Sequence, residues 1–265
     1  MTIEQLVNSS LESGIRPIEL RLCGIVNPQG DTIAYRSESK INSIVCGCLG
    51  PADYADAIDF SEAGEELFLR NIALAALVLS KKTNEGKRLE WISVRCPTVF
   101  LEDANAVSKL LSKLKSIGCE SLKNRLCIEL SDEIMTNVSE VIKSRIIDLK
   151  SIGLKVCIYG GGKKSFAFMM LPSVRADYLI IEGYDSSRND GSEVYGAIAS
   201  LASSLGTKVI IESVRTEKDL YELSRRDIRY ALVSGSELAK NFGANDLNLL
   251  AEEFVGAEVA KLYAE

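Results

Sequence analysis

Short apolar segments alternate with longer amphipathic segments along most of the chain. Eight of the short segments are rich in β-branched, leucine and aromatic residues, as strands are: residues 18–26, 31–35, 89–95, 125–130, 154–159, 176–182, 208–213 and 228–233. The first two flank Asn27-Pro28-Gln29-Gly30, which is typical of a tight turn. The pattern therefore predicts eight strands, of which the first two are antiparallel neighbours.

Helical patterns lie between most of these strands. Residues 65–82 are apolar on one wide face, and residues 105–118 and 140–153 both end in glycine, which is a usual helix stop. Residues 37–61 follow neither pattern and are predicted to be an irregular insertion. A last amphipathic helix is predicted from Asp246 to the C-terminus.

This alternation of strands and helices predicts a fold of the α/β class. Repeated strand–helix units favour a parallel sheet, and eight strands in 265 residues favour a (βα)8 TIM barrel, modified by its antiparallel first pair of strands. No linker or change of composition divides the chain. We therefore expect residues 1–265 to form one domain.

Composition and charge exclude several classes of partner. Hydrophobic residues make up 46% of the chain and charged residues 26%, which is ordinary for a globular protein. A net charge of −6 provides no basic field to attract nucleic acid or anionic lipid. No apolar run reaches the roughly 18 residues of a membrane span, and the first residues lack the layout of a signal peptide. We expect a cytoplasmic protein without a nucleic-acid or membrane partner.

The chain contains seven cysteines and no histidine. In a reducing compartment most of the cysteines should be small buried hydrophobes, and Cys127 and Cys157 are predicted to face the barrel interior. Cys46 and Cys48 are the one close pair, and their role stays open. Without histidine, a zinc site would need several thiolates or carboxylates, and a serine–histidine triad is excluded. No metal or cofactor is predicted.

A glycine-rich turn, Gly160-Gly161-Gly162, follows the predicted strand at 154–159 and precedes Lys163 and Lys164. It is not a P-loop, because Cys157 stands where the first glycine of that motif belongs and no serine or threonine follows Lys163. Two interpretations of the lysines stay open. They are either part of a solvated loop or capture an anion beside the N-terminus of the next helix.

Function in a barrel lies at the carboxyl ends of its strands. These positions hold Arg36, Arg95, Glu129, Tyr159, Glu182, Glu212 and Leu232. Glutamates spread among arginines make a poor cage for a divalent cation, because the arginines repel the ion.

The order and spacing of these strand ends resemble EAL domains, which hydrolyse the bacterial second messenger cyclic di-GMP on a modified (βα)8 barrel. Residues 159–182 align without a gap with the family segment that runs from its paired aspartates to its LKID motif. Glu129 matches the family's EITES segment and Glu212 matches its AEGVET segment. The resemblance covers nearly the whole chain and implies an EAL-like barrel.

The resemblance also implies which groups are missing. Family enzymes hold two divalent cations with carboxylates and an asparagine, and the cations activate water for attack on phosphorus. At the matching positions this chain has Arg36 for the glutamate of the EAL tripeptide, Arg95 for the asparagine, Tyr159 and Gly160 for the paired aspartates, Ile180 for the lysine, Arg215 for a second glutamate and Leu232 for a glutamine. Glu129 and Glu212 are retained, and Asp132 keeps a carboxylate in place of a loop-stabilising glutamate.

We therefore expect a degenerate EAL domain, a pseudoenzyme in bacterial signalling that binds a regulatory protein. Arg36 and Arg95 are predicted to pair with Glu129 and Glu212. Lys40 lies where the family has a phosphate-contacting arginine, so a non-hydrolysing receptor for cyclic di-GMP or another phosphorylated ligand is the alternative. An active phosphodiesterase with a rearranged site is less favoured. A homodimer stays open, because EAL relatives often dimerise.

Overall fold

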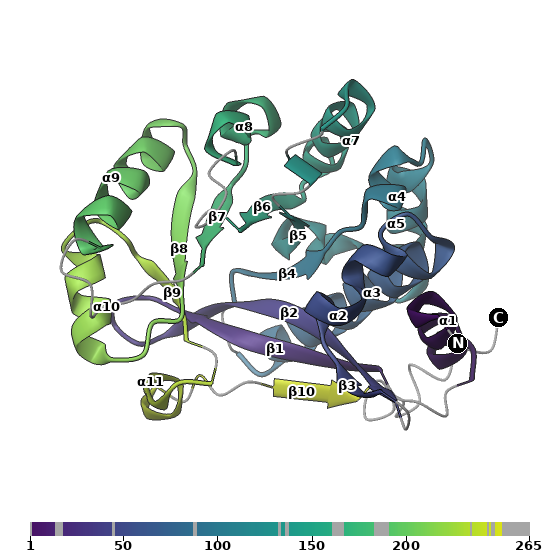
Figure 1. The fold of residues 1–265 in the computed structure, drawn as a ribbon, viewed down its shortest axis with the longest axis horizontal. Helices are drawn as coiled ribbons and strands as arrows, with labels where there is room; N and C mark the ends of the chain where they lie inside the picture. Colours follow the sequence, from purple (N-terminus) through teal and green to yellow (C-terminus); the bar gives the residue numbers. More distant parts are fainter. Residues whose placement is uncertain are drawn as a thin grey trace.

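Eight strands form a closed barrel in this computed structural model (Figure 1). They are β1 (Ile18–Val26), β2 (Thr32–Ser43), β4 (Trp91–Arg95), β5 (Leu126–Ser131), β6 (Lys155–Tyr159), β7 (Tyr178–Ile181), β8 (Lys208–Glu212) and β9 (Tyr230–Leu232). The structure describes residues 2–13, 18–43, 46–86, 89–131, 134–135, 138–160, 167–182, 191–233, 235–242, 244 and 247–250.

The strand order confirms the predicted modified barrel. β2 and the strands from β4 to β9 are parallel neighbours in sequence order. β1 is antiparallel to β2 on one side and to β9 on the other, and these two pairings close the ring. All the parallel strands therefore point their carboxyl ends to one rim of the barrel, which we call the mouth.

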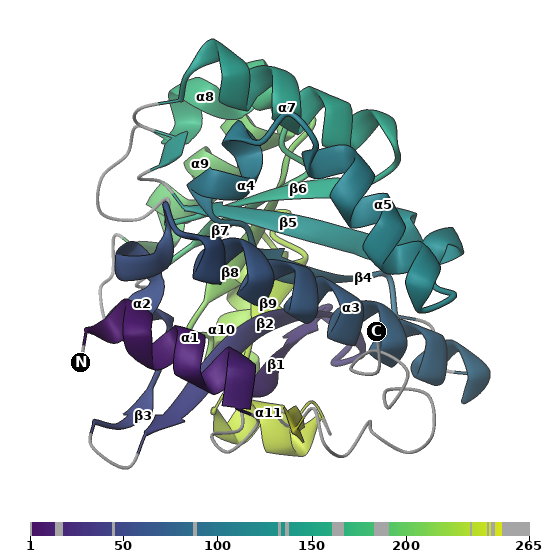
Figure 2. The same ribbon diagram turned by 90° about the vertical axis from the view of Figure 1, so that its right-hand side faces the viewer.

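Helices cover the outside of the barrel (Figure 2). They are α3 (Glu62–Asn84), α4 (Thr98–Glu102), α5 (Ala106–Ser116), the 3₁₀ helix η1 (Glu120–Arg125), α7 (Glu140–Ser151), α8 (Ala167–Val174), α9 (Gly191–Ser204), α10 (Glu217–Ser224) and α11 (Glu237–Asn241). The hydroxyls of Ser61 and Ser139 cap α3 and α7 by accepting backbone N–H groups of the first turn. Within the described residues, no helix combines the length and the apolar character that crossing a membrane requires.

The barrel interior is packed rather than hollow. Every strand of the ring contributes to one buried cluster, which contains Cys23, Ile25, Ala34, Trp91, Cys127, Cys157, Tyr178, Ile180, Ile210 and Leu232. The rings of Trp91 and Tyr178 pack against each other at 4.5 Å between centroids, with their planes tilted by 36°. Cys127 and Cys157 are fully buried here, so their predicted place in the interior is confirmed.

Residues 37–61 are not the irregular insertion that the sequence predicts. β2 continues to Ser43, β3 (Gly47–Leu49) pairs back against it, and α2 (Pro51–Ile58) follows. The strand is hidden in the sequence because serines stand at positions 37 and 39, where a buried strand would ordinarily be apolar. Their hydroxyls form hydrogen bonds to Ser93 and Asn71, which makes their burial favourable.

The helix predicted from Asp246 is wrong for residues 247–250. These residues form β10 (Leu247–Leu250), which pairs antiparallel with residues 19–22 of β1. β9 pairs with β1 only at Ile25 and Val26, so β10 covers an edge of β1 that β9 leaves open. Residues 251–265 lie outside the described residues. At the other end, α1 (Ile3–Ser13) buries Leu6 and Val7 against β1, β2 and α3.

Candidate functional site

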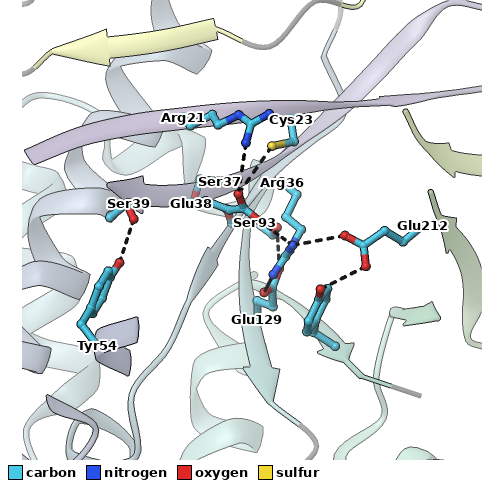
Figure 3. A network of polar contacts seen from close by, with 11 residues as sticks. Arg21, Cys23, Arg36, Ser37, Glu38, Ser39, Tyr54, Ser93, Glu129 and Glu212 are labelled. Carbon is cyan, nitrogen blue, oxygen red and sulfur yellow. Dashed lines mark hydrogen bonds and ion pairs between the residues drawn. The ribbon is translucent and has the colours of Figure 1, made fainter. Parts of the chain in front are cut away.

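Arg36 lies at the centre of the mouth, and its side chain points across the barrel toward β5 (Figure 3). Its Nε donates to Oε2 of Glu129 and its Nη2 donates to Oε1 of the same carboxylate, both at 2.9 Å. Arg36 is 6% exposed and Glu129 is 2% exposed. The pair is therefore a buried, bidentate salt bridge, in which the planar guanidinium matches both carboxylate oxygens.

Two further carboxylates approach the same guanidinium. Nη1 of Arg36 donates to Oε1 of Glu38 at 2.8 Å and lies 3.7 Å from Oε1 of Glu212 (Figure 3). Arg36 is thus the cation shared by three glutamates from β2, β5 and β8. Arg21 on β1 adds a second positive charge, 3.9 Å from Oε2 of Glu38.

Tyr159 completes this cluster from β6. Its ring centroid lies 3.7 Å from Cζ of Arg36, which places the guanidinium over the aromatic face. Its hydroxyl donates to Oε2 of Glu212 at 3.0 Å. We call Arg36, Glu38, Glu129, Tyr159 and Glu212 the mouth cluster.

Burial and neighbouring charges set the protonation of the mouth cluster. Burial alone would lower the pKa of Arg36, but the charge and the hydrogen bonds of Glu129 outweigh it, so the pKa is raised above its ordinary value. Burial raises the pKa of Glu212, and Arg36 only partly offsets this. Burial also raises the pKa of Tyr159, with Arg36 acting in the opposite direction. The arginine stays charged and the tyrosine stays a hydrogen-bond donor.

Two serine hydroxyls form hydrogen bonds beside the mouth cluster. The Ser93 hydroxyl donates to Oε2 of Glu129 at 3.2 Å, and Ser37 donates to the backbone carbonyl of Ser93 at 2.5 Å. In the parallel register Arg36 lies beside Ser93. A small hydroxyl at this position leaves room for the guanidinium to reach from β2 past β4 to Glu129 on β5.

Arg95 does not join the mouth cluster, so the prediction that it pairs with Glu129 or Glu212 is wrong. Its Nη2 lies 3.7 Å from Oδ1 of Asp56 on α2. The side chain is 32% exposed and Asp56 is 87% exposed, so this ion pair is a weak surface contact. Apolar periodicity does not predict this partner, because α2 lies within residues 37–61, the region predicted to be irregular.

The other predicted positions lie at different depths in the barrel. Ile180 and Leu232 belong to the buried interior cluster below the mouth. Gly160 follows Tyr159 with a φ of +117°, a conformation that favours glycine. Lys40 lies on β2, opposite Glu19 of β1, and is partly exposed. Lys163, Lys164 and Asp132 lie outside the described residues.

Sequence reasoning missed Glu38 and Ser93. Glu38 stands where the family has the leucine of its tripeptide, so the comparison gave no reason to choose it. Strand periodicity does give one, because residues 36 and 38 of a strand share a face.

The comparisons with known proteins agree with the barrel fold. The sequence profile of the EAL domain matches residues 25–236. The chain belongs to the EAL domain family. No curated protein sequence matches it.

Solved EAL structures share the fold of this EAL domain at low sequence identity. The PaMucR phosphodiesterase in complex with c-di-GMP is 16% identical, with a TM-score of 0.75 over 96% of this chain and 100% of that chain. The FimX EAL domain from Pseudomonas aeruginosa bound to c-di-GMP is 14% identical, with a TM-score of 0.72 over 88% and 94% of the two chains. An EAL domain protein from Listeria monocytogenes EGD-e is 18% identical, with a TM-score of 0.69 over 95% and 94%.

The mouth cluster of this EAL domain does not fit a divalent metal. A metal would have to share Glu129 and Glu212 with the Arg36 guanidinium, which is already in contact with both and would repel it. Within the described part of the chain, no group of three or more acidic or thiol side chains is arranged to hold a metal ion. The fixed Arg36 side chain neutralises Glu129 and Glu212 in the place that an ion would take.

Proposed function

We propose that this EAL domain does not hydrolyse cyclic di-GMP and acts in signalling by binding another protein. The observation that carries the proposal is the bidentate pair of Arg36 with Glu129. In family enzymes the matching carboxylates hold the cations that activate water. Here the Arg36 guanidinium binds the Glu129 carboxylate instead. An arginine cannot lower the pKa of a bound water as a divalent cation does.

Two replacements near Arg36 support the loss of hydrolysis. Tyr159 stands where the family has the first of its paired aspartates, and its phenol has a raised pKa, so it carries no charge for a metal. Ile180 stands where the family has its lysine and lies fully buried in the barrel interior. The chain therefore lacks both a ligand and a cationic side chain that the family chemistry requires.

Retention of the scaffold supports a role in binding. The barrel keeps a packed interior and helices on its outer face, which present extended surfaces to a partner. Arginine and tyrosine are enriched at protein interfaces, and two such residues near the mouth reach solvent: Arg95, whose side chain is 32% exposed, and the half-buried Tyr159. A surface function requires only these groups and no bond-breaking residue.

A receptor for a cyclic dinucleotide is the second candidate. FimX EAL domains and PaMucR have been solved with c-di-GMP bound, and this chain keeps a basic residue, Lys40, on β2 beyond the mouth cluster. Against it, the Arg36 guanidinium at the mouth is already neutralised by Glu38, Glu129 and Glu212 and offers no free charge to a phosphate. We therefore rank the receptor below the protein-binding function.

Hydrolysis and nucleotide binding can be tested on the same sample. The protein is incubated with cyclic di-GMP and Mg²⁺ or Mn²⁺, and we expect no linear dinucleotide by chromatography. Thermal denaturation with cyclic di-GMP tests the receptor, because a ligand at 100 times its Kd adds about 2.7 kcal/mol to the free energy of unfolding.

Two results would decide against the proposal. Linear dinucleotide formed at enzyme-like rates and lost in Glu129→Gln would show an active phosphodiesterase. Saturable thermal stabilisation by cyclic di-GMP that is weakened in Lys40→Ala would move the conclusion to the receptor.

A further inference from the structure

A groove on the outside of the barrel combines an apolar floor with a charged rim. It lies along the N-terminal half of α3, between α1 on one side and α4 and α5 on the other, and has a volume of about 880 Å³. Figure 2 shows α3 with α1 and α5 beside it. We call it the α3 groove.

The floor of the α3 groove is apolar. Leu69, Ala73 and Leu74 of α3 line it, together with Leu11 of α1 and Val99 of α4. Leu11, Leu69 and Val99 are only partly buried, so apolar surface stays open to solvent along the groove. From Glu62 to Leu74 the lining follows α3 for about 18 Å at 1.5 Å per residue.

Carboxylates surround this apolar floor, and they come from three elements of the chain. The groove is lined by Glu62, Glu65, Glu66, Glu102 and Asp103, against the cations Arg70, Lys109 and Lys113. Lys109 is already held by Glu65 and by Asp103, the latter at 2.7 Å. Glu62, Glu66 and Glu102 form no ion pair with the described residues and are exposed, and Arg70 and Lys113 form none either. The lining as a whole has five carboxylates against three cations, so the rim is net negative.

The local fold accounts for only some of these carboxylates. Glu62 and Glu65 lie in the first turn of α3, where the helix dipole favours a negative charge. Glu66 lies one turn beyond Glu62 and one turn before Arg70 on the same face, so its repulsion from Glu62 is offset by its attraction to Arg70. Glu102 is the last residue of α4, where the dipole disfavours a carboxylate. Glu102 therefore carries an electrostatic cost that a bound cation would relieve.

We propose that the α3 groove binds an amphipathic helix of a partner protein, with an apolar stripe flanked by lysine or arginine. The apolar floor between two helical walls suits the apolar face of a third helix, whose anchors recur at i, i+3, i+4 and i+7. The unpaired carboxylates at the rim match its basic flanks. This inference rests on the proposed protein-binding function and assigns it a surface and a partner chemistry.

The experiment uses the full chain and a fluorescein-labelled peptide as the probe. The peptide consists of leucine and lysine, is about 14 residues long, and has its leucines on one helical face. A shuffled peptide of the same composition has no apolar stripe. We expect the striped peptide to bind at least about tenfold more tightly than the shuffled one by fluorescence anisotropy, a difference of about 1.4 kcal/mol.

Two groove variants and a matched control locate the binding. Leu69→Asp removes an apolar contact of the floor, and the double variant Glu62→Lys/Glu66→Lys reverses exposed rim charges. Each should lower the affinity for the striped peptide at least about tenfold. The double variant Glu193→Lys/Glu217→Lys makes the same change of net charge on α9 and α10, and its affinity should equal that of the wild type.

Other outcomes would overturn the inference. Equal binding of both peptides, or unchanged binding by both groove variants, would show non-specific attraction to an acidic protein. Deletion of residues 251–265 that raises the affinity about tenfold would make this segment the occupant. A dimer in sedimentation that Leu69→Asp converts to a monomer would make a second copy the occupant. None of these results changes the hydrolysis assay, so the two proposals can fail separately.

Discussion

Arg36 and Glu129 are 93 positions apart in the sequence and meet through two hydrogen bonds of 2.9 Å each. They come from β2 and β5, with β4 between them. The guanidinium therefore links two strands that are not direct neighbours in the ring. Because both side chains are buried, each depends on the other for its counter-charge.

Removing one member of this pair should be costly. Arg36→Leu leaves the Glu129 carboxylate buried without its cation, and we expect the free energy of unfolding to fall by about 3–5 kcal/mol. Urea denaturation followed by circular dichroism measures this change. Arg229→Leu is the control, because Arg229 and Asp227 form a pair at 2.8 Å with side chains that are 71% and 75% exposed.

The double variant Arg36→Leu/Glu129→Leu separates loss of a partner from loss of the pair. Because it removes both buried charges, it should recover most of the stability that Arg36→Leu loses. The contrary result is a double variant that loses as much free energy of unfolding as the two single variants together. That result would show that attraction within the pair, and not the cost of an unpaired buried charge, accounts for the loss in Arg36→Leu.

The Tyr159 hydroxyl should contribute less than its ring. Tyr159→Phe removes the hydrogen bond to Glu212 but keeps an aromatic face against Arg36, so we expect a loss of about 1 kcal/mol. Tyr159→Leu also removes the cation–π contact and should lose about 1 kcal/mol more. Tyr221→Phe is the matched control, since Tyr221 is 62% exposed. Equal stabilities of the phenylalanine and leucine variants would contradict the role of the ring.

Glu212 should make stability depend on pH. Its pKa is raised in the folded protein because the carboxyl is buried. The folded state then holds this proton more tightly than the unfolded chain. Stability should therefore fall as the pH rises from the ordinary glutamate value of about 4.3 through the raised value.

The variant Glu212→Gln isolates this titration, because it has no proton to lose at position 212. The free energy of unfolding of the wild type relative to the variant should increase as the pH is lowered from about 7 to about 5, and should level off below the unfolded value. Denaturation at a series of pH values measures the difference. A difference that shrinks as the pH falls would mean that the pKa is lowered instead.

Gly64 should resist substitution because of the turn between α2 and α3. A Cβ atom at Gly64 would lie 2.1 Å from the backbone carbonyl oxygen of Ile58, so Gly64→Ala forces the two helices apart. We expect a loss of about 1–3 kcal/mol, as for other overpacked sites. Gly196→Ala in α9 meets only the flexible side chain of Arg226 at 3.3 Å. That variant should be neutral or more stable by up to about 1 kcal/mol, because alanine favours a helix.

The sequence predicts the barrel well where side chains alternate in the ordinary way. Strands such as β6 and β8 are apolar on both faces, since one face packs inside the barrel and the other under helices. Arg36 was found with Glu129 and Glu212 because the resemblance placed all three at strand ends on one rim.

The missed elements are those whose stability comes from distant partners. Ser39 is buried on β2 because Asn71 on α3 donates to its hydroxyl at 2.6 Å and Tyr54 on α2 donates to its carbonyl at 3.0 Å. β10 exists because β1 offers an edge to pair with. A short window of the sequence does not contain these distant partners. Apolar periodicity therefore predicts neither the buried Ser39 nor β10.

The antiparallel first strand has a consequence for synthesis of the chain. β1 completes its pairing with β9 and β10, and roughly 200 residues separate it from β9. At about 5–20 residues per second, the ribosome leaves this edge of β1 uncovered for about 10–40 s. An uncovered edge is a template for pairing with other chains. We predict that nascent chains stalled after α10 remain protease-sensitive in β1 and β2, and that protection appears only once β9 has emerged.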